Sequence, residues 1–320
     1  MIEEGRLNIV SQKMFPDVDF QSIKESSRSA DVEDCIGLDY SAINEDMQST
    51  VQETSLHHSS CLRFMRSMPD GCFKLIFTSP PYNLGKEYER KMSIDTYLES
   101  IQEDIWEMVR VLDSNGSLCW QIGNHVENGA LLPLDFMFYP IFKDIGLNLS
   151  GRFIWTYGHG LHAKKRFSGR YETILWFTKG ADFTFSFKAA ADGSLITPDG
   201  VDFEVWNSIR NEWNMGIFDI PNVKSNHPEK TLHPCQFPVE LAERFILART
   251  EKGDAVYDPY AGAASTLIAA VKHGRRAYGT DKEESYVSLG RQRLAAFSDG
   301  TLNLRPLGKP IFSPKQNKKG

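Results

Sequence analysis

The sequence has little that would place the protein in a membrane, in an oxidising compartment or around a metal ion. No apolar run approaches the roughly 20 residues of a membrane-spanning helix, and residues 1–8 lack the basic-then-apolar order of a secretory signal. The five cysteines are scattered and form neither a CxxC pair nor a Cys/His cluster with zinc-ligand spacing. We therefore expect a cytoplasmic protein with reduced thiols, no membrane partner and no metal.

An excess of basic residues, which is typical of nucleic-acid-binding proteins, is also missing. The 320 residues include 36 basic and 42 acidic ones, which gives a net charge of −6. Twelve of the acidic but only four of the basic residues fall within residues 1–54, a segment without helical or alternating periodicity. We expect this segment to be a loosely ordered acidic extension. The rest of the chain is then close to +2 and is repelled by DNA less than the total charge suggests.

From residue 55 on, short apolar strands alternate with amphipathic helices, which predicts an α/β domain with a largely parallel sheet. The alternation is interrupted at residues 181–232, where turn signals and short aromatic runs predict an inserted region. From Arg305 onward the chain has five basic residues, three prolines and no acidic residue, and we expect residues 301–320 to form a mobile basic tail. Strands are expected at 73–77, 117–122, 153–157, 174–178, 255–257 and 276–279, and helices at 61–65, 94–112, 131–145, 238–250 and 266–273.

A stiff segment, Ser79-Pro80-Pro81-Tyr82, follows the first of these strands. Two consecutive prolines fix φ and remove two N–H donors, so the segment presents its carbonyls rigidly. The Ser79 hydroxyl and the Pro80 carbonyl can accept hydrogen bonds from an exocyclic amine. Tyr82 can stack on a base that has left the double helix, a contact worth roughly 1–3 kcal/mol. Taken alone, the segment is equally compatible with a proline-stiffened loop that ends a strand.

A second segment, residues 256–266, combines a strand, a loop of small residues and the start of a helix. Small residues let a ligand approach the backbone, and a helix N-terminus favours a carboxylate such as that of a methionine moiety. Asp281, twenty-three residues after Asp258 and at the end of the next expected strand, can bind ribose hydroxyls. The G-x-G-x-x-G pattern of nicotinamide-binding folds is missing, which disfavours that cofactor.

Together the two segments resemble the β-class amino methyltransferases of DNA, in which the catalytic motif precedes the cofactor motif. The resemblance spans about residues 56–296. It implies a Rossmann-like sheet, mostly parallel with one antiparallel strand and with helices on both faces. It also implies S-adenosylmethionine as the cofactor, double-stranded DNA as the substrate and a bacterial-type cell. Members of the family often form homodimers, so a second copy of the chain is an expected partner. The catalytic motif matches Ser79, Pro80, Pro81 and Tyr82, and the expected cofactor-binding residues are Asp258, Pro259, Tyr260, Gly262, Ser265, Thr266, Asp281 and His233.

The same resemblance assigns a role to each part of the folded chain. Residues 55–180 correspond to the catalytic half of the methyltransferase domain, 181–232 to a target-recognition insertion and 233–300 to the cofactor-binding half. Within these parts, residues 170–179 resemble the strand that closes the target-base pocket. Residues 227–238 resemble the segment that leads to the helix beside the cofactor.

The chain departs from the family at two places. The family's Gly-Ser-Gly-Thr-Thr reads Gly-Ala-Ala-Ser-Thr at residues 262–266 here, so that Ala264 requires a loop compatible with a Cβ and is expected to weaken cofactor binding. The family's Gly-Asp-Cys reads Ser59-Ser60-Cys61. The contact of that aspartate with the adenine ring is therefore not carried over, although Ser60 could make a weaker one.

A basic stretch lies at residues 158–170, within the catalytic half of the domain. Four full positive charges fall within seven residues of it, and no acidic residue occurs nearby. We expect this stretch to close on DNA phosphates through Lys164, Lys165, Arg166 and Arg170, the alternative being an ordinary solvated charge run. His159 and His162 lack a third partner at ligand spacing, so we expect no metal there.

The choice of base is open between two amines. Cys235 follows a proline, as the nucleophile of C5-cytosine enzymes often does, but it does not follow the catalytic strand and is interpreted as structural. In the family, Ser before Pro-Pro-Tyr is more typical of cytosine-N4 enzymes and Asp of adenine-N6 enzymes. The sequence therefore favours site-specific methylation of cytosine N4, with adenine N6 as the alternative. A non-catalytic DNA-binding module and an RNA or protein amine methyltransferase are further alternatives.

Overall fold

The computed structural model describes residues 53–83, 92–127, 129–158, 168–187, 195–224 and 226–309. The strands in these residues are β1 Thr54–His58, β2 Phe73–Thr78, β3 Leu112–Ile122, β4 Asn124–Glu127, β5 Ala130–Pro133, β6 Asn148–Thr156, β7 Tyr171–Thr178, β8 Ile217–Asp219, β9 Ala255–Asp258 and β10 Arg276–Asp281. The helices are α3 Cys61–Arg66, α4 Ile94–Val111, α5 Leu134–Asp144, α6 Phe203–Met215, α7 Val239–Arg249, α8 Ser265–Lys272 and α9 Glu284–Ser298.

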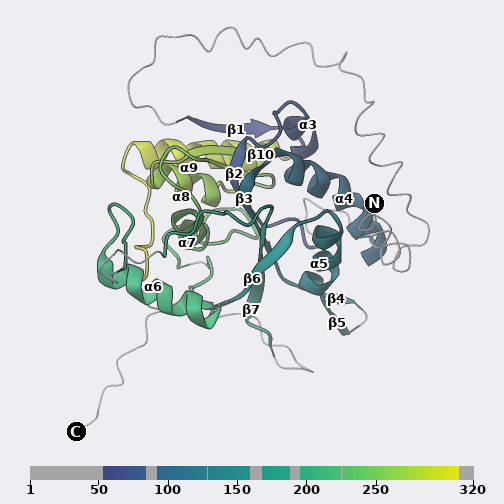
Figure 1. Ribbon diagram of the computed structural model, residues 1–320. Helices are drawn as coiled ribbons and strands as arrows, with labels where there is room; N and C mark the ends of the chain where they lie inside the picture. The colour runs from purple at the N-terminus through teal and green to yellow at the C-terminus, as the bar shows by residue number, and fades with distance from the viewer. Residues whose placement is uncertain are drawn as a thin grey trace. The chain divides into compact units, whose positions relative to one another are not determined.

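Eight of the described strands form one sheet, in the order β1-β10-β9-β2-β3-β7-β6-β8 (Figure 1). Strand β7 runs antiparallel to both of its neighbours, and every other pair in this sheet is parallel. Strands β4 and β5 form a separate antiparallel hairpin. The prediction of a Rossmann-like sheet, mostly parallel with one antiparallel strand, is therefore confirmed.

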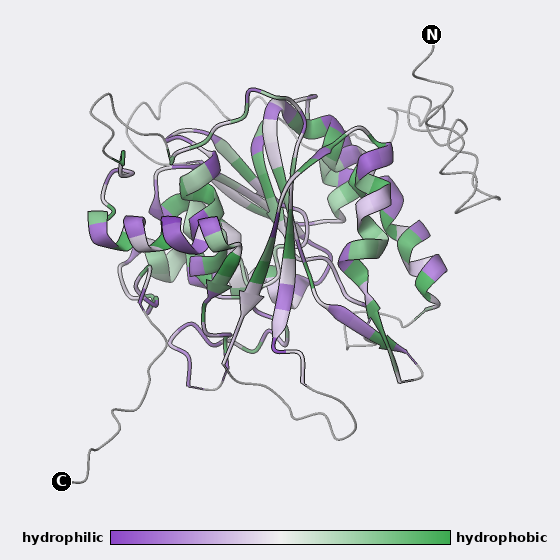
Figure 2. Ribbon diagram, turned by 60° about the horizontal axis from the view of Figure 1, so that its bottom comes forward, coloured by the Kyte–Doolittle hydropathy of each residue, from purple (hydrophilic) through white to green (hydrophobic). Residues whose placement is uncertain are grey.

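Helices cover both faces of the sheet, and each face has its own hydrophobic core. Because successive side chains of a strand point to opposite faces, Leu75 and Phe77 pack in the core under α6, α7 and α8, whereas Ile76 packs in the core under α3, α4 and α5. Strand β7 alternates in the same way, with Trp176 on the first side and Phe177 on the second. Figure 2 shows hydrophobic residues in green interspersed with white and purple ones along the central strands, and hydrophilic residues in purple on the helices. This two-sided burial explains why the strands read as continuous apolar runs.

The predicted insertion at residues 181–232 contributes directly to the main domain. Helix α6 begins after Asp202, whose carboxylate accepts from the N–H groups of residues 204 and 205, and ends at Gly216 in the left-handed conformation. It buries Trp206, Ile209 and Trp213 in the core that it shares with α7 and α8. Strand β8 then extends the sheet by pairing with β6. Residues 203–219 are therefore part of the domain's core layer, and a role of this region in target recognition stays a prediction.

The boundaries expected at the two ends of the folded chain also change. Thr54, the last residue of the predicted acidic extension, begins β1 and pairs with Ala277, and residues 1–52 lie outside the described residues. At the other end, Arg305 is only 8% exposed and belongs to a buried ion-pair network. The prediction of a mobile basic tail at residues 301–320 therefore does not fit Arg305, which this network holds, and residues 310–320 lie outside the described part.

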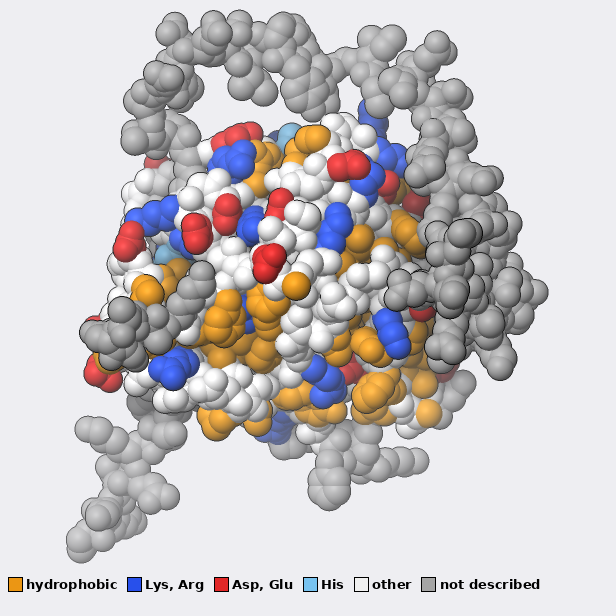
Figure 3. Space-filling view, viewed as in Figure 1, with side chains coloured by type: hydrophobic (Ala, Val, Ile, Leu, Met, Phe, Trp, Pro, Cys, Tyr) orange, Lys and Arg blue, Asp and Glu red, His pale blue; other side chains and the backbone are white. Residues whose placement is uncertain are grey.

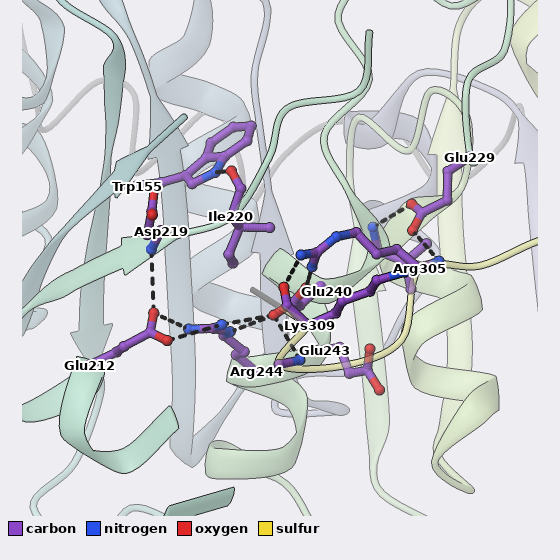
Figure 4. Close-up of polar contacts among 12 residues, drawn as sticks. Trp155, Glu212, Asp219, Ile220, Glu229, Glu240, Glu243, Arg244, Arg305 and Lys309 are labelled. Atoms are coloured by element: carbon purple, nitrogen blue, oxygen red, sulfur yellow. Dashed lines mark hydrogen bonds and ion pairs between the residues drawn. The ribbon is translucent and has the colours of Figure 1, made fainter. Parts of the chain in front are cut away.

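Figure 4 shows this network, in which Glu240 is the central carboxylate. Glu240 is completely buried; it accepts from Arg244 at 2.7 Å, from the N–H of Gly308 at 3.0 Å and from the Arg305 guanidinium. Arg244 also pairs with Glu212 of α6 at 2.7 Å. The two buried guanidiniums balance a charge that would be costly to bury alone. The network joins α6, α7 and the chain after α9.

Candidate functional site

A cavity of about 790 Å³ opens at the carboxyl ends of the parallel strands. Residues 79–83 line it after β2, residues 259–263 after β9, Asp281 at the end of β10 and residues 59–62 after β1. In open α/β sheets this edge is where ligands bind. The cavity brings together the two motifs that the sequence places about 180 residues apart.

The Ser79-Pro80-Pro81-Tyr82 segment is held from several directions. The Tyr97 hydroxyl of α4 donates to the carbonyl of Pro81. Asn83, which has a positive φ of 56°, makes two 2.8 Å bonds to the backbone N–H and carbonyl of Met92. The Tyr82 ring lies so close to Gly123 that a Cβ there would come within 3.0 Å of it. The segment is thus fixed before any ligand binds.

A chain of hydrogen bonds leads from this segment to a carboxylate on β7. The hydroxyls of Ser79 and Tyr82 lie 3.0 Å apart, and the Tyr82 hydroxyl donates to Glu172 Oε2 at 3.2 Å. Glu172 also accepts from the Gln121 amide and, at 3.5 Å, from the Tyr157 hydroxyl. Burial raises the pKa of Glu172, against the opposing effect of these donors. Sequence spacing alone could not have paired Tyr82 with a residue 90 positions away.

Asp258 lies beneath the cavity rather than on its surface. It is completely buried and accepts from Thr78 Oγ1 and Thr266 Oγ1, both at 2.7 Å, and from the N–H of Tyr260 at 3.2 Å. Burial, the largest cause, raises its pKa to about 6. Neither Asp258 nor Thr266 lines the cavity, because both side chains point into the bonds that tie β2, the loop after β9 and α8 together. The direct cofactor contact expected for these two residues does not fit this placement.

The loop after β9 needs a glycine at one position and accommodates an alanine at another. Gly262 has a φ of +47°, and a Cβ there would lie 2.8 Å from His233 Nε2. Ala264 adopts the left-handed conformation with its methyl group fully buried. It faces Gly290 of α9, where an added Cβ would come within 3.1 Å of the Ala264 methyl. The Cβ that departs from the family pattern therefore fits because residue 290 has no side chain.

His233, which precedes α7 in the chain, lies against Gly262 of this loop and is neutral at pH 7. Its pKa is lowered to about 4, first by burial and then by the charges of Lys230 and Arg293. The ring packs edge-on against Tyr286 at 4.4 Å, and its Nδ1 accepts from the N–H of Cys235 at 3.3 Å. This bond assigns the proton to Nε2, so His233 is a hydrogen-bond donor beside Gly262.

Two further carboxylates line the cavity near the start of α3. Asp281 accepts from the N–H groups of Gly262 and Glu283, both at 2.9 Å, through different oxygens. The N–H of Ser59 donates to the Asp281 carbonyl at 3.0 Å, which places residues 59–61 beside it. Asp104 of α4 accepts from the Tyr260 hydroxyl at 2.6 Å.

Burial, and after it the neighbouring Asp104 carboxylate, raises the pKa of the Cys61 thiol. Ser60 Oγ, by contrast, accepts from the N–H of Arg63 and caps α3. Asp104 was not singled out from the sequence, because α4 carries it as one acidic residue among several.

The predicted DNA-binding residues lie only partly within the described chain. Lys164, Lys165 and Arg166 fall in residues 159–167, outside the described part. Arg170 lines the cavity and donates to the Gly158 carbonyl at 2.9 Å, across the base of that segment. On the face shown in Figure 3, acidic and basic side chains are interspersed. No group of His, Cys, Asp or Glu within the described ranges could hold a metal ion.

Comparison with known proteins decides the family. Residues 73–292 match the N6/N4 methyltransferase family model, described as DNA methylase. The protein belongs to the DNA methylase family. It is 34% identical over 284 residues to the type II methyltransferase M.BglII of Bacillus subtilis, which covers 81% of this chain and 76% of that protein. It is 30% identical over 249 residues to the DNA adenine methyltransferase YhdJ of Escherichia coli strain K12, covering 74% and 81%.

The fold agrees with the family. A DNA modification methylase from Thermus thermophilus, solved with S-adenosylmethionine, aligns with a TM-score of 0.56 and 24% identity over 76% of this chain and 95% of that one. The protein is thus a DNA methyltransferase of the N4/N6 amino methyltransferase family, and its cofactor is S-adenosylmethionine. No helix in the described ranges has the length and apolarity to cross a membrane.

The structure places most predicted site residues around one cavity. The residues that line it are Ser79, Pro80, Pro81, Tyr82, Pro259, Tyr260, Gly262, Ser265, Asp281, His233 and Arg170. The lining of this cavity fits S-adenosylmethionine. The carboxylates of Asp281 and Asp104 can accept hydrogen bonds from its hydroxyl and amino groups, and the neutral His233 and the small residues of the loop after β9 leave room for it. Cavity residues that the sequence does not single out include Tyr97, Asp104, Gln121 and Tyr157, whereas Glu172 lies in the segment expected to close the target-base pocket.

Proposed function

We propose that the protein transfers a methyl group from S-adenosylmethionine to the N4 amine of a cytosine that has left double-stranded DNA, at specific sites. The observation that carries this proposal is that the Ser79–Tyr82 segment and the loop before α8 line the same 790 Å³ cavity. A methyl donor and a flipped base can therefore meet there without a covalent intermediate, because the sulfonium is already a good leaving group. The work of the protein is then alignment of the two reactants.

On the base side, Ser79 Oγ and the Pro80 carbonyl accept hydrogen bonds from the exocyclic amine. These bonds turn the nitrogen lone pair out of conjugation and toward the methyl group. Tyr82 stacks on the base, and the contact of its ring with Gly123 supports the ring from behind. The bonds of Tyr97 and Asn83 to the segment's backbone keep this geometry fixed, which is the preorganisation that amine transfer needs.

On the cofactor side, Asp281 accepts from the ribose hydroxyls, and each of its oxygens already accepts one backbone N–H from the surrounding loops. Pro259, Tyr260, Gly262 and Ser265 form the wall beside it. His233 donates its Nε2–H toward the ligand at Gly262. Asp258 and Thr266 act from beneath, by holding this wall against β2.

The adenine end of the cofactor site uses Asp104. Ser60, which replaces the family's aspartate, is engaged in capping α3. Asp104 lines the cavity beside residues 59–62 and is held in place by Tyr260. Its carboxylate can accept a hydrogen bond from the adenine amine, so an acidic residue on α4 takes the role that the loop after β1 has lost.

Contacts with DNA phosphates involve Arg170 at the cavity mouth and the neighbouring residues Lys164, Lys165 and Arg166. Arg170 already anchors the base of this segment through Gly158. Phosphate contacts of this kind position the duplex and do not read its sequence. Lys165→Ala should weaken binding to all DNA sequences alike and reduce the salt slope by about one.

Ser79 favours cytosine, but one observation supports adenine N6 as the second candidate. YhdJ, at 30% identity, is a DNA adenine methyltransferase. The decisive experiment incubates the protein with duplex DNA and isotope-labelled S-adenosylmethionine, digests the DNA to nucleosides and identifies the product by mass spectrometry. Labelled N4-methylcytosine supports the proposal, whereas N6-methyladenine alone replaces it by the second candidate. A protein that binds S-adenosylmethionine but methylates neither base contradicts both.

A further inference from the structure

Methylation of an amine leaves one proton too many on the nitrogen. The nitrogen lone pair forms the new N–C bond, the S–C bond breaks with its electron pair going to sulfur, and an N–H proton must then leave. A serine hydroxyl that accepts this proton cannot keep it, because a protonated hydroxyl is a strong acid. Ser79 therefore needs a second group to which it can pass its own proton.

We propose that Glu172 is the terminal proton acceptor of the methyl transfer and that the hydroxyls of Ser79 and Tyr82 relay the proton to it. The inference rests on the proposed function. Its geometric basis is an unbroken hydrogen-bonded path, with 3.0 Å between Ser79 Oγ and Tyr82 Oη and 3.2 Å between Tyr82 Oη and Glu172 Oε2. As the amine releases its proton to Ser79, Ser79 passes its own proton to Tyr82, and Tyr82 passes its proton to the Glu172 carboxylate.

The surroundings of Glu172 suit this role. The groups that face its carboxylate are the hydroxyls of Tyr82 and Tyr157, the amide of Gln121 and the more distant ammonium of Lys224. These groups hold the carboxylate in one orientation. Burial raises its pKa, so that the ionised form is a stronger base than a carboxylate in water.

Two other carboxylates at the cavity serve different bonds. Asp104 is bound to Tyr260 and Cys61, and Asp281 is bound to the N–H groups of the cofactor loops. Among the described residues that line the cavity, Glu172 is the carboxylate hydrogen-bonded to the Ser79–Tyr82 segment.

A different role for Glu172 would be to stay protonated and donate a hydrogen bond to a ring nitrogen of the base. The two roles predict opposite results for Glu172→Gln. Gln keeps the shape and can donate through its amide, so a donor role would survive the substitution. A proton acceptor would be lost, because an amide does not take up the proton.

The test measures single-turnover methylation of duplex DNA between pH 5 and pH 9, with S-adenosylmethionine at a concentration far above its Kd. The wild-type rate should rise with pH as Glu172 ionises and then level off. Glu172→Gln should lower the plateau rate about 100-fold or more, the usual contribution of a positioned base, and remove the rise. The Kd for S-adenosylmethionine should stay within about threefold of the wild-type value.

Two further variants separate the relay from a general loss of structure. Tyr82→Phe interrupts the path and should slow the reaction to a similar extent, and combining it with Glu172→Gln should add little, because both act on one path. Tyr171→Phe removes the hydroxyl of an exposed tyrosine on β7 that does not line the cavity, and it should retain most of the rate.

The outcomes are distinguishable. An active wild type whose Glu172→Gln variant keeps its rate, or whose own rate falls with rising pH, refutes the relay alone. The relay is also refuted if Tyr82→Phe and Glu172→Gln slow the reaction independently, so that their effects add in the double variant. A wild-type protein that methylates no base refutes the proposed function, and the relay with it.

Discussion

Replacing Asp258 by two different residues tests whether this side chain holds the cofactor loop from beneath. Asp258→Ala removes the acceptor for the Thr78 hydroxyl and the Tyr260 N–H. A buried donor without a partner costs about 1–3 kcal/mol, so the variant should lose about 2–6 kcal/mol of unfolding free energy. Asp258→Asn keeps an oxygen for these two donors. The NH2 group of the new asparagine takes the place of the oxygen that accepts from Thr266. The Thr266 hydroxyl can then donate to the Phe77 carbonyl, 3.3 Å away, instead.

The raised pKa of Asp258 determines how the stability difference between Asp258→Asn and the wild type changes with pH. Because the folded pKa is raised from 3.8 to about 6, the folded protein holds a proton that the unfolded chain has released between these two pH values. The contribution of Asp258 to stability therefore falls as pH rises through this window and reaches its low level above pH 6. Asn resembles the protonated acid at every pH. The stability of Asp258→Asn relative to the wild type should thus increase by roughly 1–2 kcal/mol between pH 5 and pH 8.

Urea unfolding at both pH values measures these differences, provided that the m-value stays constant. Titration with S-adenosylmethionine completes the test, because Asp258→Asn should leave its Kd nearly unchanged. A stability difference that does not grow with pH would refute the account of the buried charge. A large rise in the Kd at unchanged stability would show instead that Asp258 contacts the cofactor directly.

Three other substitutions test the cavity and the core. Asp281→Ala should raise the Kd for S-adenosylmethionine about 10- to 100-fold in a calorimetric titration, since charge-assisted hydrogen bonds contribute about 1.5–3 kcal/mol; an unchanged Kd would contradict the proposed ribose contact. Gly262→Ala should also weaken cofactor binding, by about tenfold or more, because its Cβ meets His233 and its left-handed backbone costs roughly 1–2 kcal/mol. Glu240→Ala should cost about 3–5 kcal/mol of stability, as measured by urea unfolding, because the buried Arg305 guanidinium loses its carboxylate partner and Arg244 keeps only Glu212. Asp199→Ala, which breaks an exposed ion pair with side chains 61% and 79% exposed, is its control and should leave the midpoint nearly unchanged.

The parts of the fold that the sequence predicts well are those with strong local signals. The apolar run of β2 and the amphipathic pattern of α4 appear within one residue of the expected bounds, whereas β7 begins three residues and β3 five residues before the expected start. Strand β1 was missed because only Leu56 of its five residues is buried, so that it lacks an alternating pattern. Helix α9 was missed for a related reason, since its buried positions include Gly290 and Arg293, which do not form an apolar stripe.

Helix α6 shows a different limit. Trp206, Ile209 and Trp213 have helical spacing, and Asp202 and Gly216 are good end signals, but the turn residues before them led to the prediction of an irregular insertion. In the site, the contiguous motifs were found, whereas contacts between distant segments were not. Nothing in local spacing distinguishes the buried Asp258 from the cavity-lining Asp281, because both are acidic residues at the ends of parallel strands.

The neighbouring positions of β2 and β9 in the sheet also constrain how the protein is made. Strand β2 pairs with β9, and the bond between Thr78 and Asp258 joins residues 180 positions apart. At a synthesis rate of about 5–20 residues per second, roughly 10–40 s pass between the appearance of the two strands. During that interval one edge of β2, in which four of the six residues are apolar, has no partner, and such an edge is a site for aggregation. The order of the motifs, with the catalytic one first, therefore leaves this edge of β2 unpaired until the cofactor half has been synthesised.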